Sequence, residues 1–126
     1  MVFRSNTAAR ANMRGGGANG ISGEATFIQR CDGVLVTVRV NGLPADNESG
    51  FFALHIHQGD NCSGEGFTET GGHYNPASVP HPEHAGDLPP LLSCGGKAYM
   101  QVLTSRFTVG EVIGRTIVIH GGIGDT

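Results

Sequence analysis

Apolar residues recur at every second position along much of this 126-residue chain, and this period limits the possible folds most. In residues 34–40, valine alternates with Leu35, Thr37 and Arg39. Successive side chains of a β-strand point to opposite faces, so such a segment has one buried face. Short strands separated by turn residues are typical of an antiparallel sandwich or barrel. We expect strands over residues 9–14, 21–28, 34–40, 51–57, 98–104 and 115–120.

Three segments indicate further local structure. Residues 30–33 (Arg-Cys-Asp-Gly) are typical of a tight hairpin turn, because Asp-Gly readily adopts positive φ angles. Thr108 and Glu111 form a Thr-x-x-Glu capping pattern, which predicts a short helical turn. Residues 51–57 alternate little, so we expect both faces of that strand to be covered.

The length and composition predict a single domain over residues 1–126, with one hydrophobic core. A net charge of −3 gives no basic surface for nucleic acid. A membrane-spanning helix needs a run of about 18 apolar residues, which this sequence lacks. Residues 1–7 have no apolar stretch of a signal peptide, and we expect them to form a flexible tail. The compartment stays open, either cytoplasmic or exported after processing.

Residues 58–96 interrupt the period. They are rich in glycine, proline, asparagine and serine, and no strand or helix pattern emerges from them. A structureless loop of this length within a small domain is usually functional or disordered. This one contains four of the seven metal ligands that we propose, and a bound ion would replace the apolar core that the segment lacks. We therefore expect residues 58–96 to form a metal-binding loop, with His73, His81, His84 and Asp87 as its ligands.

The six histidines of the chain fit one metal-ligand pattern. Histidine is the commonest metal ligand in proteins, since its neutral ring nitrogen binds zinc, copper and iron. His55 and His57 stand two apart on a predicted strand, so their rings point to the same face. Six histidines with one aspartate are about what two adjacent ions need. The complete set is His55, His57, His73, His81, His84, Asp87 and His120.

Each part of this pattern alone has a simpler explanation. His55 and His57 could be two polar residues on an exposed strand face. The triplet at residues 81, 84 and 87 could belong to a polar surface loop, and His120 could simply end a strand. A module in which zinc only orders the loop would leave His55, His57 and His120 unexplained. The metal interpretation accounts for all of them together.

Four motifs, in order along the chain, resemble those of the copper/zinc superoxide dismutases, with a bacterial character. They are His-Ile-His at residues 55–57, Gly-His-Tyr-Asn-Pro at 72–76, His-Pro-Glu-His-Ala-Gly-Asp-Leu-Pro at 81–89, and Ile-Gly-Arg-Thr-Ile-Val-Ile-His at 113–120. The resemblance covers the chain from about Ala8 to Asp125. It implies an eight-stranded, all-β Greek-key barrel or sandwich with a long metal-binding loop.

The resemblance also implies an activity and a role for each ligand. The enzyme would disproportionate superoxide to dioxygen and hydrogen peroxide through copper redox cycling, with zinc as the structural and tuning metal. Arg115 matches a structural position of the family, and we assign it no catalytic role. The implied copper ligands and catalytic residues are His55, His57, His73 and His120, and the implied zinc ligands are His73, His81, His84 and Asp87.

The family pattern continues beyond residue 126 with a steering loop, an arginine beside copper, a cysteine and a final strand. From this difference we expect a barrel without its last strand, whose open edge allows homodimers or higher self-association. We keep one alternative function open. The chain could be a copper- and zinc-binding relative with weak or no dismutase activity, because the arginine and the steering loop are absent.

Further expectations concern the three cysteines and Asp125. Cys62 matches the family's loop cysteine, and it could be free, pair with Cys31 or Cys94, or link to another chain. We favour a Cys62–Cys94 disulfide, because both residues flank the metal loop. Asp125 is expected to stand in for the family's aspartate that connects ligands of the two metals.

Overall fold

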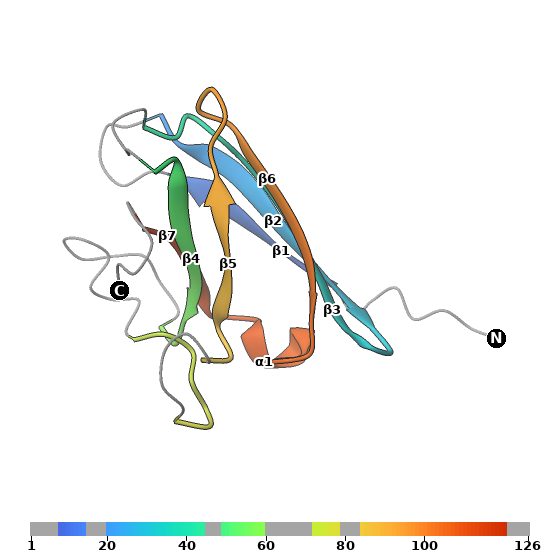
Figure 1. Cartoon of the computed structure of the whole chain (residues 1–126). Coiled ribbons are helices and arrows are strands. Elements are labelled where there is room, and N and C mark those ends of the chain that lie inside the picture. The colour runs from blue at the N-terminus through green and yellow to red at the C-terminus, as the bar shows by residue number, and fades with distance from the viewer. Residues whose placement is uncertain (1–7, 15–19, 45–48, 60–71, 79–83, 121–126) are drawn as a thin grey trace.

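The computed structural model describes residues 8–14, 20–44, 49–59, 72–78 and 84–120. Within these residues the chain forms two antiparallel β-sheets that face each other (Figure 1). One sheet has the strand order β1-β2-β3-β6, and the other has the order β5-β4-β7. The elements are β1 (Ala8–Arg14), β2 (Ser22–Arg30), β3 (Gly33–Asn41), β4 (Phe51–His57), β5 (Asp87–Leu92), β6 (Ala98–Thr104), α1 (Val109–Val112) and β7 (Thr116–Ile119).

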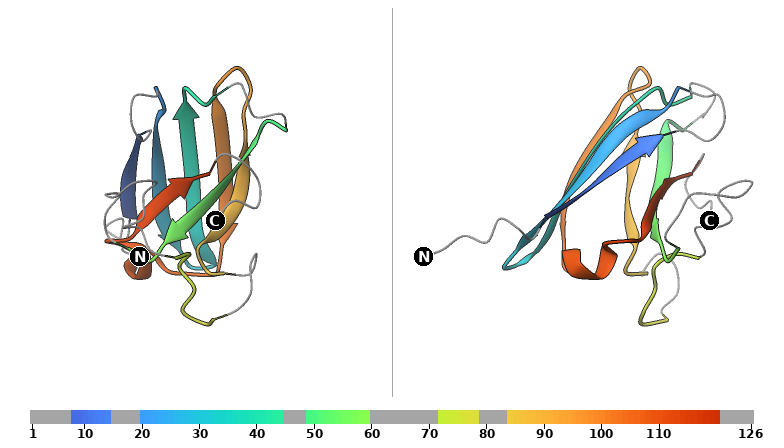
Figure 2. Two further views of the ribbon diagram at one scale, coloured as in Figure 1. Left: turned by 90° about the vertical axis from the view of Figure 1, so that its left-hand side faces the viewer. Right: turned by 180° about the vertical axis from the view of Figure 1, so that it is seen from behind.

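The core lies between the two sheets. Val34, Val36 and Val38 of β3 are fully buried, which confirms the predicted alternation. They form one apolar cluster with Leu54 of β4 and Leu91 of β5. Burying a side chain of this size stabilises the fold by about 1.5–3 kcal/mol. The strands β4 and β7 cross those of the larger sheet diagonally (Figure 2), so the two inner faces interlock at an angle.

The chain passes between the sheets in the manner of a Greek key. Strand β6 pairs with β3, although β4 and β5 of the other sheet separate them in sequence. The fourth strand of this run thus returns to lie beside the first, as in a Greek key, with β3 and β4 in different sheets. The predicted all-β Greek-key class is therefore confirmed.

The local predictions are confirmed as well. Arg30 pairs with Gly33 at the end of the β2–β3 hairpin. Thr108 and Glu111 form a capping box at the start of α1. In β4 every side chain from residue 52 to 57 is buried, so both of its faces are covered. Across the described residues, no helix has the length and apolarity needed to span a membrane.

The expectation of an unstructured loop was wrong for residues 87–92, which form β5. Pro89 and Pro90 lie in this strand and hide its pattern, because proline cannot donate a backbone hydrogen bond. The strand tolerates them because it lies at the edge of its sheet and pairs only with β4. The pairing also shifts register between Phe52 and Leu54, opposite the two prolines.

The predicted Cys62–Cys94 disulfide is not formed in the structure. Cys94 is a free, exposed thiol, as is Cys31, and Cys62 lies outside the described residues. Cys94 follows the end of β5 that is farther from Asp87, in the turn that leads to β6. Its place beside the metal loop in sequence therefore does not bring it to the ligand end of that strand. The expected tail at residues 1–7 also lies outside the described residues.

Gly86 lies where two backbones approach closely, and this position yields a prediction. A Cβ atom here would be 2.3 Å from the carbonyl oxygen of Ile56 and 3.0 Å from the Cβ atom of Tyr74. Gly86→Ala must therefore push the segment away from β4, and we expect the free energy of unfolding to fall by about 1–3 kcal/mol. Urea denaturation measures this change.

Gly110→Ala is the matched control, because a Cβ atom at Gly110 would meet no atom within 4 Å. Gly110 lies in α1, so we expect this variant to be neutral or more stable by up to about 1 kcal/mol. Equal stability of the two variants would contradict the steric argument.

Candidate metal centre

The ends of β4 and β7 bring three histidines together. His55 and His57 are both buried, at 3% and 4% exposure, on the same face of β4. His57 pairs with Thr116 of β7, and His120 continues this ladder by donating its N–H to the carbonyl of Ala53 at 2.8 Å. The Nε2 atoms of His57 and His120 are 3.3 Å apart. Strand pairing thus places nitrogen donors from distant parts of the sequence side by side.

A fourth histidine reaches this cluster from the loop. His73 forms an isolated β-bridge with His57, and its chain neighbours on both sides are hydrogen-bonded to the end of β4, at 2.7 and 2.8 Å. Its ring stacks on that of His55, with centroids 3.9 Å apart. One ring nitrogen from each of the four histidines lies within 4.8 Å of the others, a set we call the four-histidine group: His55, His57, His73 and His120.

His73 also belongs to a second group, which contains a carboxylate. Its Nδ1 atom is 3.1 Å from Nδ1 of His84 and 3.0 Å from Oδ1 of Asp87. Nδ1 of His84 is in turn 3.5 Å from Oδ2 of Asp87. We call His73, His84 and Asp87 the mixed group. Because His73 is common to both groups, the two sites are adjacent.

Backbone contacts hold Asp87 in place. It is the first residue of β5 and pairs with His55 across the sheet. The N–H of Asp87 donates to the carbonyl of His84, and the N–H of His84 donates to Oδ2 of Asp87, both at 3.0 Å. This reciprocal turn directs both side chains toward His73.

Burial dominates the electrostatics of the shared histidine. It lowers the pKa of His73 below its ordinary value of 6.5, and the neighbouring carboxylate of Asp87 opposes this shift only in part. His57 and His84 disfavour the charged ring further. His73 is therefore neutral at neutral pH, which is the form of histidine that binds a metal.

The donor atoms suit metal ions in number, kind and spacing. Zinc holds nitrogen and oxygen ligands at about 2.0–2.2 Å in a tetrahedron, whose corners are then about 3.3–3.6 Å apart. The mixed group spans 3.0–3.5 Å between its donor atoms, close to that spacing. The four-histidine group offers imidazole alone, a ligand that suits copper as well as zinc.

Comparison with known proteins decides the family. The family model for copper/zinc superoxide dismutase matches residues 21–126. The chain belongs to the copper/zinc superoxide dismutase family. It is 36% identical over 122 residues to the copper-zinc superoxide dismutase of Schizosaccharomyces pombe, covering 86% of this chain and 76% of that one.

Two further relatives show how much of each protein is shared. Copper-zinc superoxide dismutase 1 of Aquifex aeolicus is 35% identical over 118 residues, which cover 82% of this chain and 68% of the relative. The extracellular copper-zinc superoxide dismutase of Rattus norvegicus is 35% identical over 89 residues, or 68% of this chain and 36% of the relative. The chain thus spans about a third of the length of the extracellular relatives that it matches.

The structure brings most of the predicted ligands of this superoxide dismutase family member together. The four-histidine group coincides with the expected copper ligands, and the mixed group with three of the four expected zinc ligands. His81, the remaining zinc ligand, and Asp125 lie outside the described residues, so their roles stay predictions.

Sequence reasoning missed a set of polar contacts behind the ligands. Tyr74 donates its hydroxyl hydrogen to Oε2 of Glu111 at 2.5 Å, and the guanidinium of Arg115 covers the Tyr74 ring at 4.1 Å. The hydrogen bond between Tyr74 and Glu111 raises the pKa of Tyr74 and lowers the pKa of Glu111. Each of the three residues belongs to a sequence pattern, Tyr74 and Arg115 to family motifs and Glu111 to the capping pattern, but none of these patterns indicates that they contact one another.

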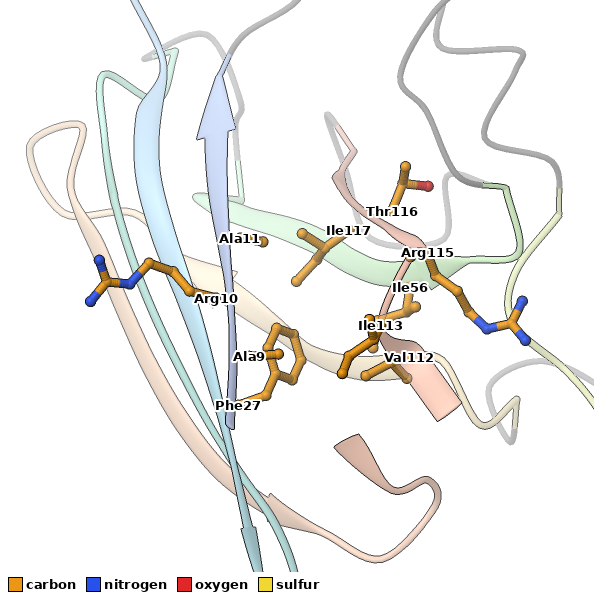
Figure 3. Close-up of a pocket in the computed structure, with 11 residues that line it drawn as sticks. Ala9, Arg10, Ala11, Phe27, Ile56, Val112, Ile113, Arg115, Thr116 and Ile117 are labelled. Carbon is orange, nitrogen blue, oxygen red and sulfur yellow. The ribbon is translucent and has the colours of Figure 1, made fainter. Parts of the chain in front are cut away.

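Thr116, opposite His57, yields a prediction about stability. It is buried, and its hydroxyl has no hydrogen-bond partner among the described residues. Its side chain points away from β1, whereas that of Ile117 points toward it (Figure 3). A buried polar group without a partner costs about 1–3 kcal/mol. We expect Thr116→Val to raise the free energy of unfolding of the metal-free protein by about 1 kcal/mol, measured in urea.

Thr37→Val serves as the control, since Thr37 accepts a hydrogen bond from Nε2 of Gln101 at 3.0 Å. Losing that bond should leave this variant no more stable than the original chain. A Thr116→Val protein less stable than the original would show that the hydroxyl has a partner after all.

Proposed function

We propose that this chain disproportionates superoxide to dioxygen and hydrogen peroxide, with copper and zinc as its metals. The observation that carries the proposal is the sharing of His73 by two ligand groups of different composition. Membership of the copper/zinc superoxide dismutase family supports it. The overall reaction takes two superoxide ions and two protons and yields one dioxygen and one hydrogen peroxide.

We assign the four-histidine group to copper. Imidazole is a good ligand for copper in both of its common oxidation states, and the carboxylate of Asp87 belongs to the other group. Copper bound there supplies the one-electron redox chemistry that zinc lacks. The chain's own contribution is rigidity, because His55 and His57 are fixed on a strand that is paired on both sides.

We assign the mixed group to zinc, with His81 as the proposed fourth ligand. Nδ1 of His73, Nδ1 of His84 and an oxygen of Asp87 provide the nitrogen and oxygen donors that zinc prefers. The role we give this site is structural. An ion bound to residues of the loop and to the first residue of β5 would tie that loop to the smaller sheet.

The shared histidine is the residue we assign to proton handling. Its Nδ1 atom faces the mixed group, which leaves Nε2 for the four-histidine group. Peroxide formation consumes two protons, and a ring nitrogen next to the reacting oxygen can hold and deliver one of them. To donate through both nitrogens the ring would have to be the deprotonated imidazolate, because neutral imidazole has only one nitrogen lone pair to offer. That form can take up a proton.

Superoxide decay tests this proposal. The chain loaded with copper and zinc should consume superoxide in proportion to bound copper. His57→Ala removes one donor from the four-histidine group. Losing even a supporting partner of a metal ligand costs about 10–100-fold in affinity or activity, so we expect at least that loss of rate.

His84→Ala is the matched control, because His84 belongs to the mixed group alone. We expect this variant to lose zinc but to keep copper-dependent decay. Decay no faster than that of free copper in the loaded chain, with both metals tightly bound, would contradict the enzyme and favour the metal-binding relative without activity.

We also propose that copies of the chain associate through the side where β1 and β7 lie. Each of these strands is the last of its sheet in the described structure. Between them lies a cleft lined mainly by apolar side chains, including those of Ala9, Phe27 and Ile117 (Figure 3). Unpaired strand edges favour pairing with another chain. Sedimentation velocity should show a dimer or larger species that grows with concentration, and a monomer at all concentrations would contradict this.

A further inference from the structure

The side chain that follows the shared histidine is anchored on the helix. Tyr74 is 6% exposed, and its hydroxyl donates to Oε2 of Glu111 at 2.5 Å. The other oxygen of Glu111 accepts from the N–H and the hydroxyl of Thr108, at 3.1 and 3.2 Å. The carboxylate is thus fixed by the helix cap, and it fixes the tyrosine in turn.

Arg115 closes this arrangement from the other side. Its Cζ atom lies 4.1 Å from the centre of the Tyr74 ring. Its Nε atom donates to the carbonyl of Glu111 at 2.9 Å, and Nη1 donates to the carbonyl of Gln58 at 3.1 Å. One guanidinium therefore contacts the helix, the tyrosine and the residue that follows His57.

Gln58 carries the connection back to the shared histidine. Its Nε2 atom donates to the carbonyl of His73 at 3.3 Å, and its backbone N–H donates to the carbonyl of Gly72 at 2.8 Å. A chain of contacts thus leads from Arg115 through Gln58 to His73, separate from the one through Tyr74. Arg115 also immediately precedes β7, the strand that leads to His120.

The geometry opposes a rotation that would disturb both ligand groups. In an extended segment, successive side chains point to opposite sides. His73 accordingly points to the metal ligands, and Tyr74 points to α1. If the segment turned about its own axis, Nδ1 of His73 would leave Asp87 and the Tyr74 hydroxyl would leave Glu111. Holding one side chain therefore holds the other.

We propose that Tyr74, Glu111 and Arg115 are positioning residues that set the orientation of the His73 ring and thereby the geometry of both metal sites. This inference rests on the proposed binding of copper and zinc. The segment from α1 to β7 contributes none of the described ligands before His120. The inference gives this segment a role in holding the ligands. We call these three residues the tyrosine clamp.

The chain contains a matched control for the clamp. Its other tyrosine, Tyr99, is 55% exposed on β6, and the guanidinium of Arg39 lies 4.8 Å from its ring centre. The same pair of residue types thus occurs twice, once behind the ligands and once on the outer surface. Tyr74→Phe and Tyr99→Phe remove the same hydroxyl group, the first behind the ligands and the second on the outer surface.

The test compares metal spectra and metal release. Wild type, Tyr74→Phe and Tyr99→Phe are loaded with Cu²⁺ and with Co²⁺ in place of zinc, to equal metal content. Cu²⁺ is followed by electron paramagnetic resonance, and Co²⁺ by its visible absorption. In Tyr74→Phe we expect both spectra to change and release of both ions to a chelator to accelerate roughly tenfold, the size of effect that partners of metal ligands have. Tyr99→Phe should match wild type in both measurements.

Spectra and release rates of Tyr74→Phe that coincide with those of wild type would overturn the inference, even if the melting temperature fell. Equal changes in Tyr99→Phe would overturn it too. A wild-type chain that binds neither metal would overturn the proposed function and the inference together, which separates that failure from a failure of the clamp alone.

A second pair of variants keeps the test decisive if Tyr74→Phe does not fold. Arg115→Lys keeps the charge but loses the planar fork that reaches two carbonyls and the ring at once. Arg39→Lys makes the same change over Tyr99. We expect altered Cu²⁺ and Co²⁺ spectra in Arg115→Lys alone, and unaltered spectra there would overturn the inference.

Discussion

The hydrogen-bond ladders on both sides of β4 are the constraint on which the metal centre depends. On one side β5 sets Asp87 opposite His55. On the other side β7 sets Thr116 opposite His57 and places His120 opposite Ala53, from where its ring reaches that of His57. Because side chains alternate between faces, a slip of one residue in either ladder would turn the donors of that strand to the opposite face. The apolar packing between the sheets opposes such a slip of β5, since it would also turn Leu91 out of the core.

The sequence predicts the fold well where one physical signal acts alone. The valines of β3 alternate with partly or fully exposed residues because one face of that strand packs on the core, and no competing pattern interferes. Strand β5 is the opposite case. Its two prolines remove backbone donors and obscure the period, and it is a strand only because β4 offers a partner on one side. That partner is distant in sequence, so nothing local in residues 87–92 reveals it.

The same distinction separates the ligands from their supports. A histidine carries its chemistry in its side chain, so spacing, absence of spare histidines and ordered motifs were enough to predict the described donors. The supporting residues are of common types, and their role depends on which residues they contact. They are Tyr74, Glu111 and Gln58. The bond between Tyr74 and Glu111 joins residues 37 positions apart, and the one between Arg115 and Gln58 joins residues 57 apart. Contacts of this kind exist only once the strands have paired.

The buried ligands also explain why the centre needs such support. His55, His57, His73 and Asp87 are each at most 9% exposed, and a buried polar group costs free energy unless it is paired. Ions bound in the two groups would convert this cost into binding energy. Before an ion binds, other contacts must hold the donor atoms in the positions that the metal requires. Contacts behind the ligands, which the metal does not form, are the ones suited to that task, and the tyrosine clamp lies there.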